Sequence, residues 1–181
     1  VLHELGLDAE FVRVDLQSRT VPSNGEAYSD INPMGKVPAL ELDDGTVLTE
    51  GAAVLQYVAD LVPGSGLAPA PGTVARYRLM ETLNFLATEV HKGYSSIFDP
   101  EVPPAYRERL MQDTRAIRHI NSLLSPGPYL RGKTFTVADA YLYSLLCLAM
   151  HAGMDFMPFP PIAAFIERVA SRPSVRESAR S

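Results

Sequence analysis

Hydrophobic positions in the first sixty residues change from a period of two to the period of a helix. Apolar residues alternate in the segment 11–16 (FVRVDL), which predicts a half-buried strand, and the run 37–42 (VPALEL) predicts a second strand. Asp-Asp-Gly at 43–45 is typical of a hairpin turn, so residues 46–48 are expected to return antiparallel. From residue 49 to near residue 63 the apolar spacing is helical. This part of the chain therefore predicts a small α/β domain.

The chain beyond residue 72 has helical spacing throughout. Residues 63–72 (PGSGLAPAPG) are rich in proline and glycine and predict a linker. Helices are expected over residues 73–98, from the prolines at 100–104 to residue 124, from residue 136 and from residue 161. Thr136 and Asp139 have capping-box spacing at the start of the third. We predict an α/β domain at 1–62, a linker at 63–72 and an all-helical domain at 73–181.

Composition and charge exclude several classes of function. The chain has 181 residues, 46% of them hydrophobic, and a net charge of −5 with acidic and basic residues interspersed. No run of five Lys or Arg residues occurs, which argues against nucleic-acid binding. The longest apolar stretch, residues 140–150, is too short to cross a membrane. The lone Cys147 excludes an internal disulfide and favours a reducing compartment, and no His or Cys cluster has the spacing of metal ligands.

One proline interrupts the second predicted strand. Because Pro38 cannot donate a hydrogen bond to a sheet, it must lie at the start or the edge of a strand. A trans Val37–Pro38 bond entering an edge strand is the commoner arrangement. A cis bond would turn the N–H and C=O groups of Val37 outward, where they could pair with an extended, peptide-like ligand. The segment alone leaves both arrangements open.

A second candidate binding element lies at the start of the helix at residues 49–52 (TEGA). Free N–H groups and the helix dipole favour a carboxylate there, and Gly51 lets a ligand approach the backbone closely. Glu50 can accept hydrogen bonds from an ammonium group. Together they could hold the head group of an α-amino acid, although an ordinary N-cap with an acidic residue nearby is the commoner interpretation.

Three polar residues form the third candidate. Asn84 and His91 are seven residues apart on the long predicted helix, so they are expected to share a face, with Lys92 beside it. Taken alone, a histidine on a helix is more often an ordinary surface or core residue. The single Cys147 lies in an apolar helix, where a buried thiol is a poor nucleophile.

These segments together resemble the glutathione S-transferases, most closely the bacterial beta class. The matching stretches are residues 32–40 (NPMGKVPAL), 43–51 (DDGTVLTEG), 56–60 (QYVAD), 84–93 (NFLATEVHKG) and 135–141 (FTVADAY). The resemblance extends along the whole chain. It implies a thioredoxin-like N-terminal domain followed by an all-α domain, a cytoplasmic homodimer with one active site per subunit, and glutathione as co-substrate without a metal.

By this resemblance, five residues of the N-terminal domain bind glutathione. Val37 binds the cysteinyl part through its main chain, ahead of a cis Pro38. Glu50 and Gly51 hold the γ-glutamyl end, which agrees with the argument from the helix start. Arg19 replaces a lysine of the family's loop after the second strand and keeps its charge.

By the same resemblance, the helical domain supplies the remaining site residues. His91 and Lys92 line the site near the thiol and assist catalysis, and Asn84 reaches glutathione bound in the neighbouring subunit. The second substrate is a small apolar electrophile, held by irregular segments such as 94–99 and 150–157. Conjugation of such compounds, a detoxification reaction, is therefore expected, with thiol–disulfide or peroxide reduction as a further activity. The alternative is a non-catalytic ligand carrier or assembly protein of the same fold, against which the retained site residues argue.

The chain departs from the beta class at its beginning. Beta-class proteins carry a catalytic cysteine just past the first strand, whereas residues 1–6 (VLHELG) read as the last turn of a helix closed by a glycine. We therefore expect about 15 residues, a strand, a turn and half a helix, to precede Val1 and to contain this cysteine. That strand would be central in the sheet. Without it, the strands at 11–16 and 37–42 would not be adjacent partners.

Overall fold

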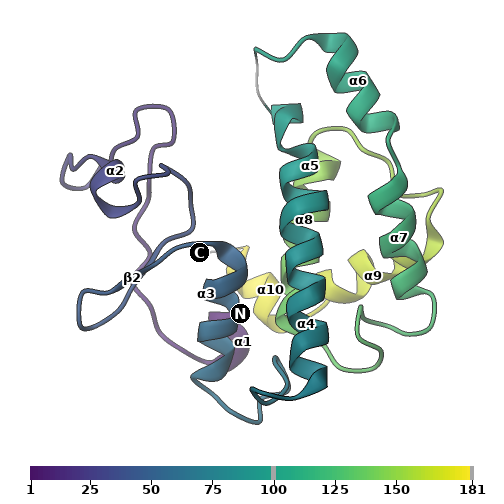
Figure 1. The fold of residues 1–181 in the computed structure, drawn as a ribbon, viewed down its shortest axis with the longest axis horizontal. Helices are drawn as coiled ribbons and strands as arrows, with labels where there is room; N and C mark the ends of the chain where they lie inside the picture. Colours follow the sequence, from purple (N-terminus) through teal and green to yellow (C-terminus); the bar gives the residue numbers. More distant parts are fainter. Residues whose placement is uncertain (99–100, 180–181) are drawn as a thin grey trace. The chain divides into compact units, whose positions relative to one another are not determined.

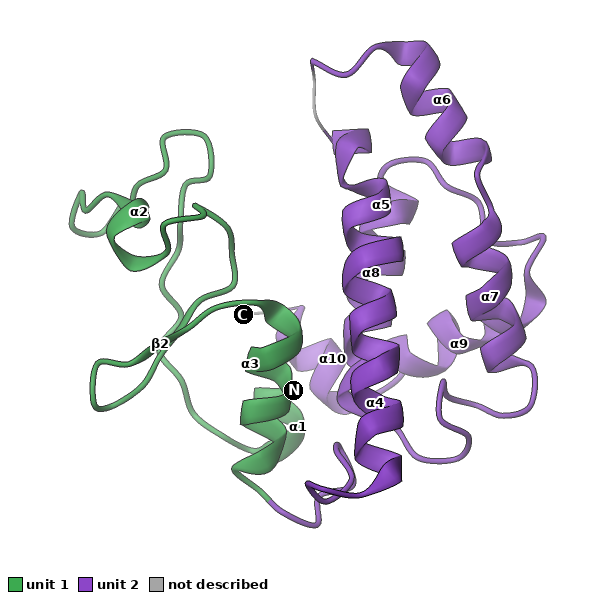
Figure 2. Ribbon diagram, in the orientation of Figure 1, with its two compact units in different colours: residues 1–62 green, residues 63–181 purple. Residues whose placement is uncertain are grey.

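The chain separates into two compact units, residues 1–62 and 63–181 (Figure 2). The computed structural model describes residues 1–98 and 101–179. In the first unit, strands β1 (Leu40–Glu41) and β2 (Val47–Leu48) form an antiparallel hairpin with Leu40 opposite Leu48 (Figure 1). Gly45 takes a φ of 81° in the turn, and its N–H donates to the carbonyl of Leu42 at 2.8 Å. The predicted hairpin is confirmed.

Three helices complete the N-terminal unit: α1 (Leu2–Leu5), α2 (Tyr28–Ile31) and α3 (Gly51–Asp60). The helix turn predicted at the beginning of the chain is confirmed as α1, which ends at Gly6 with a left-handed φ of 64°. The helix predicted from residue 49 is confirmed as α3, whose buried face includes Val58 and Ala59.

The strand predicted at residues 11–16 is not formed. Only an isolated bridge between Asp15 and Thr20 pairs this segment, and the side chains of Phe11 and Val12 are 70% and 54% exposed. The physical reason is the lack of a partner, because a strand gains its stability from neighbours and, in residues 1–98 and 101–179, no strand lies beside this segment. The alternating pattern therefore did not predict this segment, in which Val14 is half-buried while Val12 and Leu16 are each 54% exposed.

In the second unit, every regular element within the described residues 63–98 and 101–179 is a helix. Its helical segments are α4 (Val74–Phe85), the π-helix η1 (Leu86–His91), α5 (Lys92–Tyr94), the 3₁₀-helix η2 (Ser95–Phe98), α6 (Pro104–Gln112), α7 (Arg115–Leu124), α8 (Val137–His151), α9 (Pro160–Ala170) and α10 (Pro173–Ser178). The first four follow one another without a break, so the long helix predicted at 73–98 is confirmed as a helical run of mixed type. Thr73 caps it, its hydroxyl oxygen accepting the N–H of Arg76 at 3.2 Å.

The core of this unit lies where α8 packs against α4, η1 and α9, while α7 packs against α9 (Figure 1). Side chains with no more than 2% of their surface exposed form it: Leu79, Leu83, Leu86, Ile117, Ile120, Leu142, Leu146, Ile162, Phe165 and Val169. Most of these are positions that the helical spacing placed inward. The buried face of the apolar α8 extends to Leu146, whereas Leu148 and Met150 near its end are 48% and 40% exposed.

The start of α8 is held by the predicted capping box. Asp139 is fully buried and its carboxylate accepts the N–H and the hydroxyl of Thr136, at 2.8 and 2.9 Å, and the N–H of Leu130 at 2.8 Å. Burial raises the pKa of Asp139, although these donors act in the opposite direction. The cap joins the preceding loop to the central helix of the unit.

The single helix expected to reach residue 124 is instead two helices, and that prediction is wrong. Asp113 is extended, with a ψ of 94°, and its carboxylate accepts the N–H of Arg115 at 3.2 Å. Such a local bond competes with the helix and ends it. Part of the break predicted at residues 100–104 lies outside the described residues, and α6 begins at Pro104.

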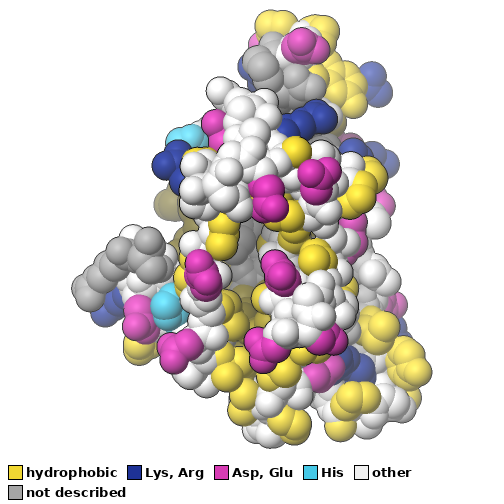
Figure 3. Space-filling view, turned by 90° about the vertical axis from the view of Figure 1, so that its left-hand side faces the viewer, with side chains coloured by type: hydrophobic (Ala, Val, Ile, Leu, Met, Phe, Trp, Pro, Cys, Tyr) yellow, Lys and Arg dark blue, Asp and Glu magenta, His cyan; other side chains and the backbone are white. Residues whose placement is uncertain are grey.

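The surface drawn in Figure 3 has acidic side chains scattered among hydrophobic and neutral ones, in keeping with the net charge of −5. Within residues 1–98 and 101–179, no helix has the length and apolar character needed to span a membrane.

Candidate functional site

The main-chain conformation that the resemblance implies at Val37 is present in the N-terminal unit. The Val37–Pro38 peptide bond is cis, so the resemblance gave the correct isomer where the segment alone favoured trans. Val37 is 45% exposed, and its N–H and C=O make no hydrogen bond to any residue that the structure describes. A Cβ atom added to Gly51 would lie 3.7 Å from Cδ of Pro38. The Val37 segment therefore lies against the start of α3.

Two buried side chains hold the residue before Val37. The hydroxyl of Tyr28 donates to the carbonyl oxygen of Lys36 at 3.0 Å, and Nδ2 of Asn32 donates to the same oxygen at 2.6 Å. Oδ1 of Asn32 in turn accepts the N–H of Met34 at 3.0 Å. The sequence analysis gave Tyr28 no role and treated Asn32 only as part of a motif. A tyrosine and an asparagine four residues apart, just before the Gly-Lys-Val-Pro segment, were the available signal.

Glu50 forms the entrance to α3 with its backbone rather than with its side chain. Its φ is 64°, and its carbonyl accepts the N–H groups of Ala53 and Val54 at 2.9 and 3.0 Å. The carboxylate does not cap the helix, and it has no cationic partner within the described chain. The N–H groups at Gly51 and Ala52 are at the positive end of a ten-residue helix. This helix start therefore offers both an acceptor for a cation and donors for an anion.

Arg19 lies beside the loop that leads to Val37. A Cβ atom added to Gly35 would be 3.9 Å from Cδ of Arg19, and the carbonyl of Arg19 accepts the N–H of Tyr28 at 2.8 Å. Its φ of 55° is, with that of Glu50, one of two left-handed values at non-glycine positions in the described chain. In the N-terminal unit, Arg19 thus lies near Gly35, two residues before Val37, and Pro38 lies against Gly51 at the start of α3.

In the helical unit, His91 lies at the end of the π-helix η1. Its Nδ1 atom is 2.9 Å from the hydroxyl of Tyr141 on α8, and the two rings meet edge-on with centroids 6.0 Å apart. Single π-helical turns are rare and are frequent at functional sites. The contact with Tyr141 orients the imidazole, and the sequence gave no indication of it.

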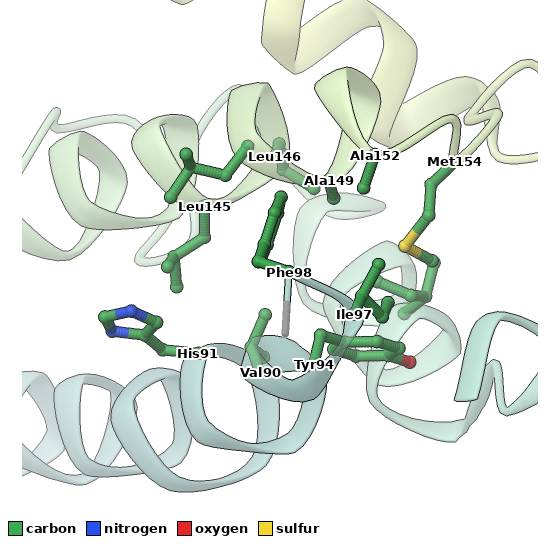
Figure 4. Close-up of a pocket in the computed structure, with 12 residues that line it drawn as sticks. Val90, His91, Tyr94, Ile97, Phe98, Leu145, Leu146, Ala149, Ala152 and Met154 are labelled. Atoms are coloured by element: carbon green, nitrogen blue, oxygen red, sulfur yellow. The ribbon is translucent and has the colours of Figure 1, made fainter. Parts of the chain in front are cut away.

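A largely apolar pocket begins at His91 (Figure 4). It has an empty volume of about 420 Å³, part of which is open to solvent. It is lined by Val90, His91, Tyr94, Ile97, Phe98, Ile117, Leu145, Leu146, Leu148, Ala149, Ala152 and Met154. Burial raises the pKa of the Tyr94 hydroxyl, which donates to the carbonyl of Asp113. The pocket includes parts of both segments predicted for the second substrate, except for residue 99, which lies outside the described residues.

The other two predicted residues of this unit are, like His91, on its surface. Asn84 on α4 and Lys92 on α5 are both exposed. The expected common face of Asn84 and His91 assumed an α-helix between them. The π-helical segment changes the residue spacing per turn there, so that assumption does not hold.

Comparison with known proteins identifies both units. The family model described as the N-terminal domain of glutathione S-transferase matches residues 1–61, and the model of its C-terminal domain matches residues 77–178. The chain is 40% identical over 178 residues to glutathione S-transferase GstA of Escherichia coli O157:H7, covering 98% of this chain and 88% of that protein.

Solved structures agree with this result. The chain is similar to BphK, a bacterial glutathione S-transferase in a ternary complex, with 42% identity and a TM-score of 0.95, covering 99% of this chain and 90% of that one. It is also similar to a beta-class enzyme of Sphingomonas chungbukensis, with 38% identity and a TM-score of 0.91, covering 99% of this chain and 89% of that one. A sphingomonad glutathione S-transferase solved with glutathione gives the same identity, TM-score and coverage. The chain belongs to the glutathione S-transferase family, with its closest features in the bacterial beta class.

Proposed function

We propose that this protein is a glutathione transferase that joins the sulfur of glutathione to small apolar electrophiles. The observation that carries the proposal is the junction of two elements in the N-terminal unit: the unpaired main chain of Val37 and the start of α3, which are in contact through Pro38 and Gly51. An extended segment of unpaired main chain beside a helix N-terminus suits a peptide that ends in an amino acid head group.

Within this proposal each group of the N-terminal unit has one task. Val37 pairs with the cysteinyl main chain of glutathione. The N–H groups at Gly51 and Ala52 bind the γ-glutamyl carboxylate, and the carboxylate of Glu50 accepts the hydrogen bonds of the glutamyl ammonium group. Arg19 supplies a cation for a carboxylate of the tripeptide. Residues 1–62 then form the glutathione-binding domain, followed by the linker 63–72 and the helical domain 73–181.

The helical unit serves the reaction and the second substrate. His91 and Lys92 carry hydrogen-bond donors that favour a thiolate over a thiol, and lowering a thiol pKa by two units corresponds to about 2.7 kcal/mol. The thiolate then attacks the electrophile, forming a carbon–sulfur bond as the leaving group departs with its electron pair. The apolar pocket beside His91 is the proposed position of the electrophile, without a metal.

We also propose that the protein has the catalytic cysteine of the beta class. Cys147 lies on α8 within the apolar helical unit and is not assigned this role. We place the catalytic cysteine ahead of Val1 in the natural protein, on the strength of the resemblance. Sequencing the N-terminus of the protein isolated from its source tests this assignment: a cysteine before Val1 supports it, and serine, tyrosine or alanine at the equivalent position contradicts it.

We further propose that the protein is a cytoplasmic homodimer and that Asn84 contacts glutathione bound to the partner. α4 supports this with the exposed apolar residues Val74 and Tyr77, 77% and 62% exposed, on the helix that also carries Asn84. The two side chains are three residues apart on one helix and so form a small apolar patch, which a protein contact would cover. Light scattering tests the dimer, with twice the chain mass as the expected result.

The central experiment measures conjugation and binding separately. With glutathione and a chloronitrobenzene-type substrate, we expect turnover and saturation by both substrates, together with retention on glutathione resin. Binding without turnover would favour the non-catalytic carrier. Absence of both in the natural protein would refute the proposed function.

A further inference from the structure

We infer that Tyr28 and Asn32 are positioning residues for glutathione, because together they orient the peptide group that presents the Val37 N–H. The inference rests on the proposed function, in which Val37 pairs with the ligand main chain. Both side chains are almost fully buried, with 3% and 4% of their surface exposed, and both donate to the carbonyl oxygen of Lys36.

Through the geometry of the Lys36–Val37 peptide bond, this contact also sets the direction of the Val37 N–H. The C=O of Lys36 and the N–H of Val37 belong to one planar peptide group, and in a trans peptide they point in opposite directions. The Lys36–Val37 bond is trans, since the cis bond in this segment is Val37–Pro38. When Tyr28 and Asn32 draw the Lys36 oxygen toward the buried side, the Val37 N–H must point away from it, toward solvent, where Val37 is 45% exposed.

The two donors are themselves fixed by one helical turn. α2 begins at Tyr28 and ends before Asn32, and the N–H of Asn32 donates to the carbonyl of Tyr28 at 2.8 Å. The carbonyl of Asn32 accepts the N–H of Gly35 at 2.8 Å, and its Oδ1 atom accepts that of Met34. These bonds leave the two side chains little freedom. Their positions four residues apart on one turn explain why both reach the same carbonyl.

This arrangement predicts an effect on the affinity for glutathione. Free rotation of the Lys36–Val37 peptide group would leave the Val37 N–H in several orientations, of which a bound peptide uses one. Fixing the peptide group before the ligand binds lowers the entropic cost of binding, so the affinity for glutathione rises. In the proposed mechanism, neither the second substrate nor the bonds that form and break contact this peptide group. The turnover rate at saturating glutathione should therefore change little when Tyr28 or Asn32 is substituted.

The test substitutes each donor in the full chain. Tyr28→Phe removes one hydroxyl without changing the ring. We expect the dissociation constant of glutathione, from calorimetric titration, and its KM to rise about three- to tenfold, with kcat within twofold of the natural value. Asn32→Ala should act in the same direction, and the double variant should bind more weakly than either single variant. Tyr57→Phe on α3, in the same unit, is the matched control and should leave the dissociation constant unchanged.

The outcomes separate positioning from simple stabilisation. Thermal unfolding is recorded for each variant, and titrations are made well below its midpoint, so that only folded protein is compared. A change in the amide nuclear magnetic resonance shift of Val37 in Tyr28→Phe supports the inference even if Asn32→Ala does not fold. If the natural protein binds glutathione and Tyr28→Phe lowers the unfolding midpoint but not the affinity, the inference is wrong while the proposed function remains. If the natural protein fails to bind glutathione, both the inference and the proposed function are wrong.

Discussion

Glu50 combines a carboxylate proposed to bind the ligand with a backbone conformation that suits glycine. At a φ of 64° a residue with a Cβ atom is strained by about 1–2 kcal/mol, and glycine is not. A protein selected for stability alone would favour glycine at this position. The charged residue is therefore explained by a function of its side chain, and strained residues of this kind cluster at functional sites.

We predict that Glu50→Gly separates binding from stability. The substitution relieves the strain and removes the carboxylate, so the unfolding midpoint should stay the same or rise while the glutathione dissociation constant rises at least tenfold. Calorimetric titration and thermal unfolding measure the two effects. Glu50→Gln, which keeps the backbone conformation, should lose affinity without gaining stability. Retained affinity in Glu50→Gly would contradict the role of Glu50.

We predict that Tyr141→Phe impairs the function of His91 without unfolding the protein. The variant loses the hydroxyl that lies 2.9 Å from Nδ1 and orients the ring. The kcat of conjugation should fall about three- to tenfold, the pH profile of kcat/KM should shift, and the KM for glutathione should change little. Tyr143→Phe on the same helix is the control and should keep the natural pH profile. An unchanged profile in Tyr141→Phe would mean that the contact has no part in catalysis.

The residue scale also shows what the sequence can and cannot specify. The sequence predicted the start of a helix at residues 49–52, and α3 begins there at Gly51, since the cues to a helix start are local; the binding roles of Glu50 and Gly51 stay predictions. The contacts of Tyr28 with Lys36 and of Tyr141 with His91 were missed. They depend on which side chains the folded chain brings together, and the 50 residues between Tyr141 and His91 carry no periodic signal for their contact.

Among secondary-structure elements, those stabilised by local interactions were predicted best. The hairpin, α3 and the start of α8 follow from turn residues, apolar spacing and a cap. The strand at 11–16 depended on a distant partner, and its prediction was wrong. The π-helical turn at Leu86–His91 also escaped prediction, because the buried positions Leu83, Leu86 and Val90 have ordinary α-helical spacing.

We predict that Asp139→Ala destabilises the helical unit by about 3 kcal/mol. The substitution leaves the buried N–H groups of Leu130 and Thr136 without their acceptor. Urea unfolding followed by circular dichroism measures the loss. Asp155→Ala is the matched control: the exposed Asp155 accepts the N–H of Met157 at 2.9 Å, and its loss should cost less than 1 kcal/mol. Equal losses in both variants would show that burial of the cap adds nothing.

A pH-dependent contribution to stability is predicted at the junction of α6 and α7. Hydrogen bonds from Arg115 lower the pKa of Asp113 from 3.8 to about 2. A carboxylate with a lowered folded-state pKa stabilises the protein above its ordinary pKa, and this contribution is lost as the pH falls toward 2. The difference in stability between the natural protein and Asp113→Asn should therefore be constant above about pH 5 and disappear near pH 2. In an Arg115→Ala background the substitution should show no such pH dependence.

At the scale of the whole molecule, the proposed binding functions are divided between the two units. The groups proposed to hold the main chain and the γ-glutamyl end of glutathione come from residues 1–62, whereas the pocket proposed for the electrophile is lined by residues of the helical unit alone. A division of this kind allows the second substrate to be changed without altering glutathione binding. It also explains why the sequence points clearly to glutathione, through short motifs, but not to one electrophile, since an apolar wall of Leu, Ile, Phe and Met side chains carries little specific chemistry.

Filling the pocket should therefore affect one substrate only. Ala149 lines the pocket on α8, and Ala149→Phe places a ring in the empty volume. We predict that the KM for a chloronitrobenzene-type electrophile rises about tenfold, while the glutathione dissociation constant stays within twofold, because Ala149 is not among the residues proposed to bind glutathione. Ala164→Phe on the exposed face of α9 controls for the added ring. An unchanged electrophile KM in Ala149→Phe would remove the pocket from the mechanism, and a matching loss of glutathione affinity would show that the two binding functions are coupled.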